Sequence, residues 1–416
     1  MKTLPGALIV CLAGTVCAFP QRPQGAPTVD GFVTRVMSPS DFSVNGIRVV
    51  CGPETQTYRS DDKSAAGGCP AEMPFIGQEM TIFGRLDPKN SVADAERIEL
   101  QVPASEEVSG AAVVEAVADS ATAAATPELY ADGYRIQLAP EATVRFDPSL
   151  RSLASVKAGT WIEYKAHLRP DGVLVATSAG FRSGPDVGGR PTSSDVNHRR
   201  LPSWPDTMMQ QRVREIADKL IPAYQRELPE DDPARINFRF DVVDSRSMGT
   251  DPIPLPDGLV LLTRQDVQLM QNDSQLAALL ADSIACILEK QTWRLRIAAN
   301  AAVSGDSILH ATEAFLGKAK QAGFSGSANE LRDVLGREYA QSARVGLELM
   351  HEAGFEIEQA PIAWWMLANH DKQLTATTLP YRSATLYRVL GALWDNPAVD
   401  RRGGSAGAGN GPAAEQ

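Results

Sequence analysis

Two separate segments of this chain repeat one pattern, and this repeat constrains the fold more than any other sequence feature. The segment NGIRVVCGPETQTY, residues 45–58, aligns with DGYRIQLAPEATVRF, residues 132–146. The later segment IGQEMTIFGRLDPKNSVADAERIEL aligns with AGTWIEYKAHLRPDGVLVATSAGF. A glycine, an arginine, Pro-Glu and a second glycine keep the same order in both copies. The repeat predicts two small antiparallel β-barrel-like modules in tandem, each with about five strands.

The pair Asn45-Gly46 stands between two short alternating apolar runs. Asn-Gly accepts positive φ at both central turn positions, so it predicts a β-hairpin. We place the first β module at residues 27–103 and the second at 127–183. The Ala-, Ser- and Glu-rich residues 104–126 are predicted to be a linker, part of which (within 109–118) pairs as the first strand of the second module.

This doubled pattern resembles a family of small exported bacterial β modules of unknown function. The resemblance covers roughly residues 27–183 and rests on the spacing of glycines and strands. It implies the fold of this part of the chain rather than its role.

Residues 1–18, MKTLPGALIVCLAGTVCA, have one lysine, an apolar stretch and small residues at the end. This pattern predicts a secretory signal peptide, after whose removal no segment is apolar enough to span a membrane. We therefore expect an exported, periplasmic or extracellular protein. Export permits a disulfide, which we predict between Cys51 and Cys69, and leaves Cys286 as a buried thiol.

The 416 residues are 43% hydrophobic and 22% charged, which is enough for a sizeable core. The net charge of -11 and the lack of a basic stripe argue against nucleic acid as a partner.

After a Gly-, Pro- and Ser-rich hinge at residues 184–202, the apolar period becomes helical. We predict an α+β, mainly helical domain at 203–396 and a disordered tail at 397–416. The whole chain is thus predicted to be multidomain. One helix, LAALLADSIACILEK, is expected to be capped by Asp273 or Ser274. Its Asp282 and Cys286 are spaced i, i+4, as a two-ligand metal site on a helix requires. A second long helix is expected to end before Gly354.

The order of these helices and strands, and above all the phrase ARVGLELMHEAGF, resembles the catalytic domain of CAAX-prenyl-endopeptidase-like zinc metallopeptidases. In that family an H-E-x-x-H helix provides two zinc ligands and the general base, and a later acidic motif provides the third ligand. The resemblance covers about residues 205–395.

Carried over residue by residue, the resemblance implies that the metal site is lost. Asp282 and Cys286 replace the two histidines, Ser283 replaces the base, and Gln341 replaces the third ligand, with Ala343 where the family has an Asp. A serine cannot deprotonate metal-bound water near neutral pH as a carboxylate does. We expect no metal, no cofactor and no hydrolysis. The plainest interpretation makes Asp282 a satisfied polar residue and Cys286 a small core residue.

In the resembled peptidases an edge strand before the catalytic helix pairs with an extended substrate. That implies a peptide-binding edge, which needs no metal because an edge offers unpaired backbone groups. An alternative, held as equally good, is that local chain covers this strand. The strand consists of Gly258, Leu259, Val260, Leu261, Leu262 and Thr263.

Other candidate sites carry less support. His310 with Glu313, His351 and His370 lack a shared ligand spacing and are expected at surface or cap positions. Of Trp364 and Trp365, one is expected in the core and the other partly exposed. There is no G-x-S-x-G elbow and no phosphate loop after a strand. Ser325 or Ser327 is expected to cap a helix.

From these features we expect an exported pseudo-peptidase that binds an extended polypeptide or a cell-envelope protein. Two alternatives stay open: a zinc metallopeptidase with a non-standard site, and an inert structural scaffold.

Overall fold

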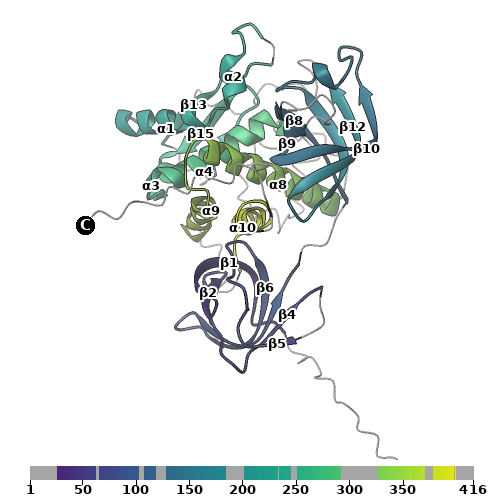
Figure 1. Cartoon of the computed structure of the whole chain (residues 1–416). Helices are drawn as coiled ribbons and strands as arrows, with labels where there is room; N and C mark the ends of the chain where they lie inside the picture. The colour runs from purple at the N-terminus through teal and green to yellow at the C-terminus, as the bar shows by residue number, and fades with distance from the viewer. Residues whose placement is uncertain are drawn as a thin grey trace, which may run out of the picture.

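The computed structural model describes residues 26–61, 65–102, 107–118, 128–183, 201–232, 234–244, 251–291, 327–370, 378–397 and 399. These residues form a lower β-barrel, a second barrel at the upper right and a helical region beside it (Figure 1). The predicted signal peptide, nearly all of the hinge and nearly all of the tail lie outside the described residues. Within the described part, no helix is long and apolar enough to cross a membrane.

The first barrel is a ring of five strands in which each strand pairs with its two neighbours. In ring order they are β1 (Val29–Ser38), β2 (Asp41–Val44), β3 (Ile47–Val50), β7 (Val92–Leu100) and β6 (Glu79–Asp87). Alternate residues such as Phe42, Val44 and Val49 point inward and form its core.

The second barrel has the same ring order. Its strands are β8 (Glu107–Ala118), β9 (Glu128–Ala131), β10 (Tyr134–Phe146), β12 (Val173–Arg182) and β11 (Trp161–Leu168). A short 3-10 helix, Leu153–Ser155, lies between β10 and β11. Part of the predicted linker pairs as the first strand of the second barrel, as expected within 109–118, and this strand, β8, extends over residues 107–118.

The prediction of purely antiparallel barrels was wrong at one pairing in each. Strands β3 and β7 pair in parallel, as do β10 and β12. The reason is geometric, because strand direction cannot alternate all the way round a closed ring with an odd number of strands. The register also agrees: Arg48 pairs with Val92 in one barrel, and Arg135 with Val173 in the other.

The turns of the two barrels match as well. The predicted hairpin at Asn45-Gly46 is confirmed, with φ of 51° and 79°, and Asp132-Gly133 forms the same turn with φ of 58° and 65°. Both central residues need positive φ, which glycine and Asn or Asp tolerate best.

An excursion distinguishes the first barrel from the second. Strand β4 (Gln56–Arg59) extends along β7, and β5 (Ala65–Gly67) pairs with β4. The predicted disulfide between Cys51 and Cys69 is confirmed and closes this excursion. Strand β10 covers the same part of the second barrel without interruption.

The helical region surrounds the central helix α4 (Asp273–Leu288). The other helices are α1 (Thr207–Leu220), α2 (Ala223–Glu227), α3 (Arg264–Leu269), α8 (Ala328–Glu352), α9 (Gln359–His370) and α10 (Tyr381–Leu393). A small sheet in the described residues has the order β13 (Arg239–Val243), β15 (Leu259–Thr263), β14 (Ile253–Pro254). Helix α4 is buried almost all round, because α1, α8 and α9 all pack on it.

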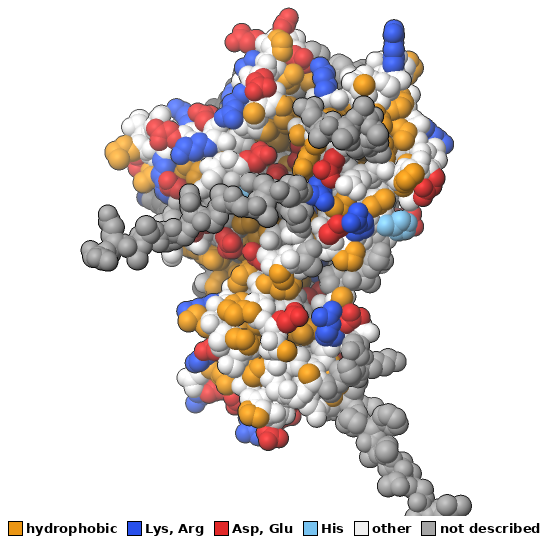
Figure 2. Space-filling model, viewed as in Figure 1, with side chains coloured by type: hydrophobic (Ala, Val, Ile, Leu, Met, Phe, Trp, Pro, Cys, Tyr) orange, Lys and Arg blue, Asp and Glu red, His pale blue; other side chains and the backbone are white. Residues whose placement is uncertain are grey.

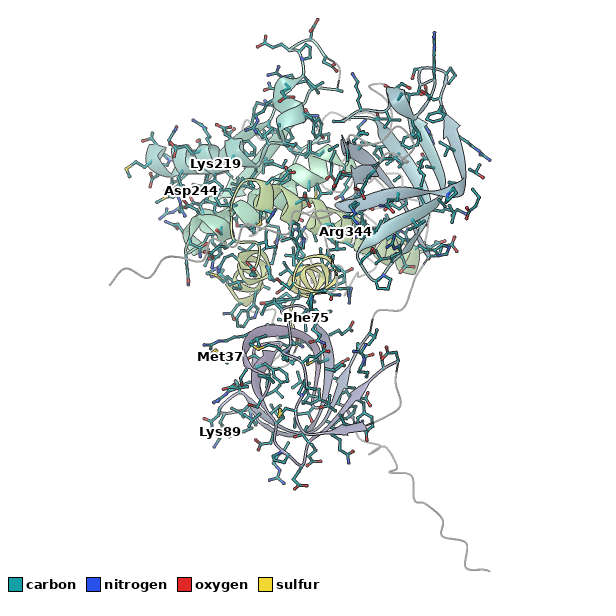
Figure 3. The ribbon with its side chains drawn as sticks, viewed as in Figure 1. Met37, Phe75, Lys89, Lys219, Asp244 and Arg344 are labelled. Atoms are coloured by element: carbon teal, nitrogen blue, oxygen red, sulfur yellow. A yellow bond between two sulfur atoms is a disulfide. The ribbon has the colours of Figure 1, made fainter. Side chains whose placement is uncertain are left out.

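The barrels contact the helical region through different side chains. In the first barrel, Phe32 belongs to the helical core, and Gly77 lies directly on the backbone of α10 at Gly391. In the second, Asp132 forms an ion pair with Arg344 of α8. Figure 3 shows Phe75 between the first barrel and α10, and Arg344 on the side of α8 toward the second barrel.

Candidate functional site

Helix α4 carries Asp282, Ser283 and Cys286, the positions that the resemblance singled out. The helix begins at Asp273, earlier than predicted, and its cap is Asn272 rather than Asp273 or Ser274, since the Asn272 side chain accepts a hydrogen bond from the backbone N–H of Gln275. Gly346 of α8 lies against the backbone of α4 at Ala281 and Asp282, where a Cβ would be 3.3 Å from the Asp282 nitrogen. This glycine lets the two helices approach closely.

Asp282 is satisfied by two neighbours from other helices. Its Oδ1 accepts a hydrogen bond of 2.7 Å from the Ser342 hydroxyl of α8, and its Oδ2 accepts one of 2.7 Å from Nη1 of Arg382 on α10. Both carboxylate oxygens of Asp282 thus accept hydrogen bonds, one from α8 and one from α10. Through these bonds Asp282 connects α4 to the other two helices.

The Arg382 guanidinium is held between two aromatic rings. Its Cζ lies 4.3 Å from the centre of the Tyr339 ring and 4.0 Å from that of Trp364. Arg382 and Asp282 expose 14% and 16% of their side chains, so their ion pair is largely shielded from water. A guanidinium stacked on rings and paired with a carboxylate is a strongly favoured arrangement. We call Asp282, Tyr339, Ser342, Trp364 and Arg382 the arginine box.

The charges in the arginine box determine its protonation states. Burial opposes the charge of Arg382, but Tyr339, Asp282 and Asp251 outweigh it, and the pKa of Arg382 is raised overall. Burial raises the pKa of Tyr339 to about 12, although Arg382 pulls it down. At neutral pH the box therefore holds a guanidinium cation and a neutral phenol.

Cys286 and Ser283 have structural environments. Cys286 is a free, buried thiol, as predicted, and burial together with the charge of Asp282 raises its pKa well above the usual value. Ser283 is buried, and its hydroxyl donates to the carbonyl of Leu279 one turn back in α4. The thiol stays protonated and the serine bonds its own helix, so neither is prepared to bind zinc or activate water.

The predicted third position, Gln341, does not join Asp282 and Cys286. Its Nε2 donates to the carbonyl of Ala111 in the second barrel and to Oε2 of Glu289. Ser342 and Tyr339 stand on the side of α8 that faces Asp282, whereas Gln341 faces the barrel. Adjacent helix positions point about 100° apart, which explains the difference.

The residues present do not fit a zinc ion. A positive guanidinium pairs with Asp282, where a second cation would be repelled, and the nearby sulfur is a thiol. Among the described residues, no group of three or more His, Cys, Asp or Glu side chains could hold a metal. His351 lies at the end of α8 with its ring 4.8 Å from that of Trp394, and His370 ends α9. His310 and Glu313 lie outside the described residues.

The predicted peptide-binding edge was wrong, because β15 is the central strand of its sheet, and the alternative, that local chain covers this strand, is confirmed. It pairs in parallel with β13 and antiparallel with β14, and all five of its residues are buried. Gly258 precedes it at φ 88° and packs against Asn237. The segment missed from the sequence is β14, where Ile253 pairs with Leu261 and Pro254 with Val260. Two residues, one of them proline, give almost no strand pattern.

Sequence reasoning also missed Arg382. One signal was present: Arg382 stands in the first turn of α10, where the helix dipole disfavours a positive charge unless an acidic partner compensates it. The prediction for the tryptophans is confirmed, with Trp364 exposed by 4% and Trp365 by 41%. Ser327 caps α8 together with Glu330, and Gly354 follows α8 at φ 78°, also as predicted.

In comparisons with known protein families and with curated proteins, no match to this sequence was found.

Proposed function

We propose that this chain is an exported, non-catalytic, peptidase-like protein that acts by binding a polypeptide or cell-envelope partner. The observation that best supports the non-catalytic part of this proposal is the arginine box. The Arg382 guanidinium lies against Asp282, at the position where the resembled peptidases have a zinc ligand. A permanent internal cation there leaves no role for a metal ion.

Two further observations support a role without hydrolysis. Ser283, at the position of the general base, is buried and bonded to Leu279, so no carboxylate faces the box from that position. The box is tied together by α4, α8 and α10, which makes it a packing element of the helical region. The Cys51–Cys69 disulfide supports the export part of the proposal, because disulfides persist in oxidising compartments.

The first experiment separates this proposal from a zinc peptidase with a non-standard site. The purified full chain is assayed for bound zinc and for cleavage of an unfolded protein, with and without a chelator. We expect no stoichiometric zinc and no chelator-sensitive cleavage. Stoichiometric zinc, with cleavage that a chelator stops and Cys286→Ala abolishes, would overturn the proposal.

A second experiment separates partner binding from an inert scaffold. Cross-linking of the full chain in intact cells should recover a reproducible protein partner, with cross-links on outer barrel strands. Cross-links confined to the chain itself would favour the scaffold. The replacement Leu261→Pro is unsuitable here, because β15 pairs on both sides and the substitution would disrupt the sheet.

A further inference from the structure

The outer face of the first barrel carries a cross-strand ion pair beside exposed apolar side chains. Asp41 of β2 pairs with Arg48 of β3 at 2.7 Å, and their side chains are exposed by 33% and 58%. Val50 of β3 pairs with Asp41, and Met37 of β1 lies in a bulge next to Ser38, the partner of Asp41 on β1. Met37 and Val50 are exposed by 60% and 36%. We call Met37, Asp41, Arg48 and Val50 the β2 face. Hydrophobic side chains gather on this side of the lower barrel in Figure 2, and Figure 3 places Met37 there.

The second barrel has the same ion pair at the same position of the repeat, but there it is covered. Arg135 of β10 pairs with Glu128 of β9 at 2.8 Å, and their side chains are exposed by only 13% and 24%. Leu393 of α10 lines a small cavity with Arg135, and Val399 contacts the turn at Gly172. In this barrel the face is therefore in contact with a protein surface, namely the end of the chain's own helical region.

The charge pattern of the β2 face indicates what covers it in the first barrel. Asp41 has two basic neighbours on this outer surface: Arg48 of β3, with which it forms the ion pair, and Arg35 of β1, whose positive charge also acts on it. The apolar side chain of Val50 lies directly across from Asp41 on β3. A two-fold axis through such a face brings Arg48 of one copy over Asp41 of the other and the apolar groups together. This self-complementarity is what a two-fold symmetric interface requires.

From these observations we infer that the β2 face is a self-association surface, at which two copies of this chain meet through their first barrels. The surface ends at the tip of the β2–β3 hairpin, where Gly46 lies beside the half-exposed Trp365 of α9. The inference goes beyond the proposed function and does not depend on the arginine box.

The test is sedimentation velocity of the full chain from micromolar to roughly hundred-micromolar concentration. We expect a reversible dimer. Met37→Glu and Val50→Glu should each weaken it about tenfold or more, because each buries an unpaired charge at the interface. Met208→Glu is the matched control. Met208 is 78% exposed on α1, and its replacement should leave the dimer unchanged.

A charge exchange adds specificity to the test. Asp41→Arg alone should weaken the dimer, and the double variant Asp41→Arg, Arg48→Asp should restore it, because the exchanged pair is again complementary across the axis. A monomer at every concentration overturns the inference, as does a dimer that Met37→Glu leaves intact. Neither result bears on zinc content or cleavage, so the proposed function stands or fails separately.

Discussion

Gly77 in the first barrel and Gly159 in the second occupy the same position of the repeat. Each donates its N–H to a carbonyl of the first strand at 2.8 Å, and their φ values are 80° and 86°. Gly77 touches the backbone of α10, whereas a Cβ at Gly159 would have no heavy atom within 4 Å. The two barrels are thus alike in the contacts that these residues make within their own barrel, and they differ in the contacts with the helical region.

The two attachments also differ in chemistry. The first barrel attaches through an apolar ring, Phe32, and a glycine contact. The second attaches through buried polar groups: Asp132 pairs with Arg344, and Glu289 accepts a hydrogen bond from the backbone of Val113. The comparison teaches that inward residues specify a barrel, while outward residues, including the turn residue Asp132, specify its place in the molecule.

The largest expected effect comes from giving each of the two turns, at Asn45 and at Asp132, the residue type of the other. Asp132→Asn should lower the free energy of unfolding by about 3 kcal/mol, because it leaves the buried Arg344 without its counter-charge. Asn45→Asp should cost about 1 kcal/mol, since Asn45 bonds the backbone of Phe32 and Asp30 near the surface. Urea denaturation measures both. Equal losses would contradict the distinction between the two attachments.

Removing the disulfide should affect the first barrel alone. Replacing Cys51 and Cys69 by alanine opens a loop with a sequence separation of 18 and should cost about 2–3 kcal/mol. Hydrogen exchange should show lost protection in β3, β4 and β7 and unchanged protection in β8 to β12. Equal loss in both barrels would show that they unfold as one unit.

The matched glycine pair isolates the contact with α10. Gly77→Ala and Gly159→Ala share a penalty of about 1–2 kcal/mol for positive φ. Only at Gly77 would the new Cβ lie 2.1 Å from the Tyr387 carbonyl oxygen, so we expect a further loss of about 1–2 kcal/mol and separation of the first barrel from α10. Small-angle scattering should show expansion for Gly77→Ala alone. If Gly159→Ala caused the same expansion, the contact between Gly77 and α10 could not be its cause.

The smallest expected effect concerns Asp395, which lies between Leu393 and Val399 in the segment beside the second barrel. Burial and the charge of Glu358 raise the pKa of Asp395 from 3.8 to about 6. The folded state therefore holds this proton more tightly, and stability should fall as pH rises from about 4 to about 6, by roughly 1 kcal/mol after solvent screening. Asp395→Asn should remove this slope from thermal denaturation curves. If Asp395→Asn left the pH dependence of stability unchanged, another titratable group would be its cause.

Predictions from the sequence succeeded where neighbouring residues decide the conformation. The turn at Asn45-Gly46, the cap at Ser327 and the end of α8 at Gly354 depend on backbone preferences within a few residues. The disulfide between Cys51 and Cys69 was also predicted, because both flank one polar loop. Predictions failed where a distant segment decides: β14 covers β15, and Gln341 faces the second barrel.

The arginine box shows the same limit most clearly. Asp282 and Cys286 share a helix and could be placed on one face from their spacing, but Arg382 is separated from Asp282 by 100 residues. No local pattern connects them, since the contact arises only when α10 packs beside α4.

By itself, the amino-acid sequence determined the repeated barrels, their turns, the covalent bridge and the shared helix face of Asp282 and Cys286. These follow from side-chain period, backbone freedom and the identity of single residues. Tertiary structure decided what pairs with Asp282, which strand lies at the centre of the small sheet and which barrel face stays open. Those outcomes depend on packing between segments far apart in the chain, where shape and charge must match across surfaces that no short stretch of sequence contains.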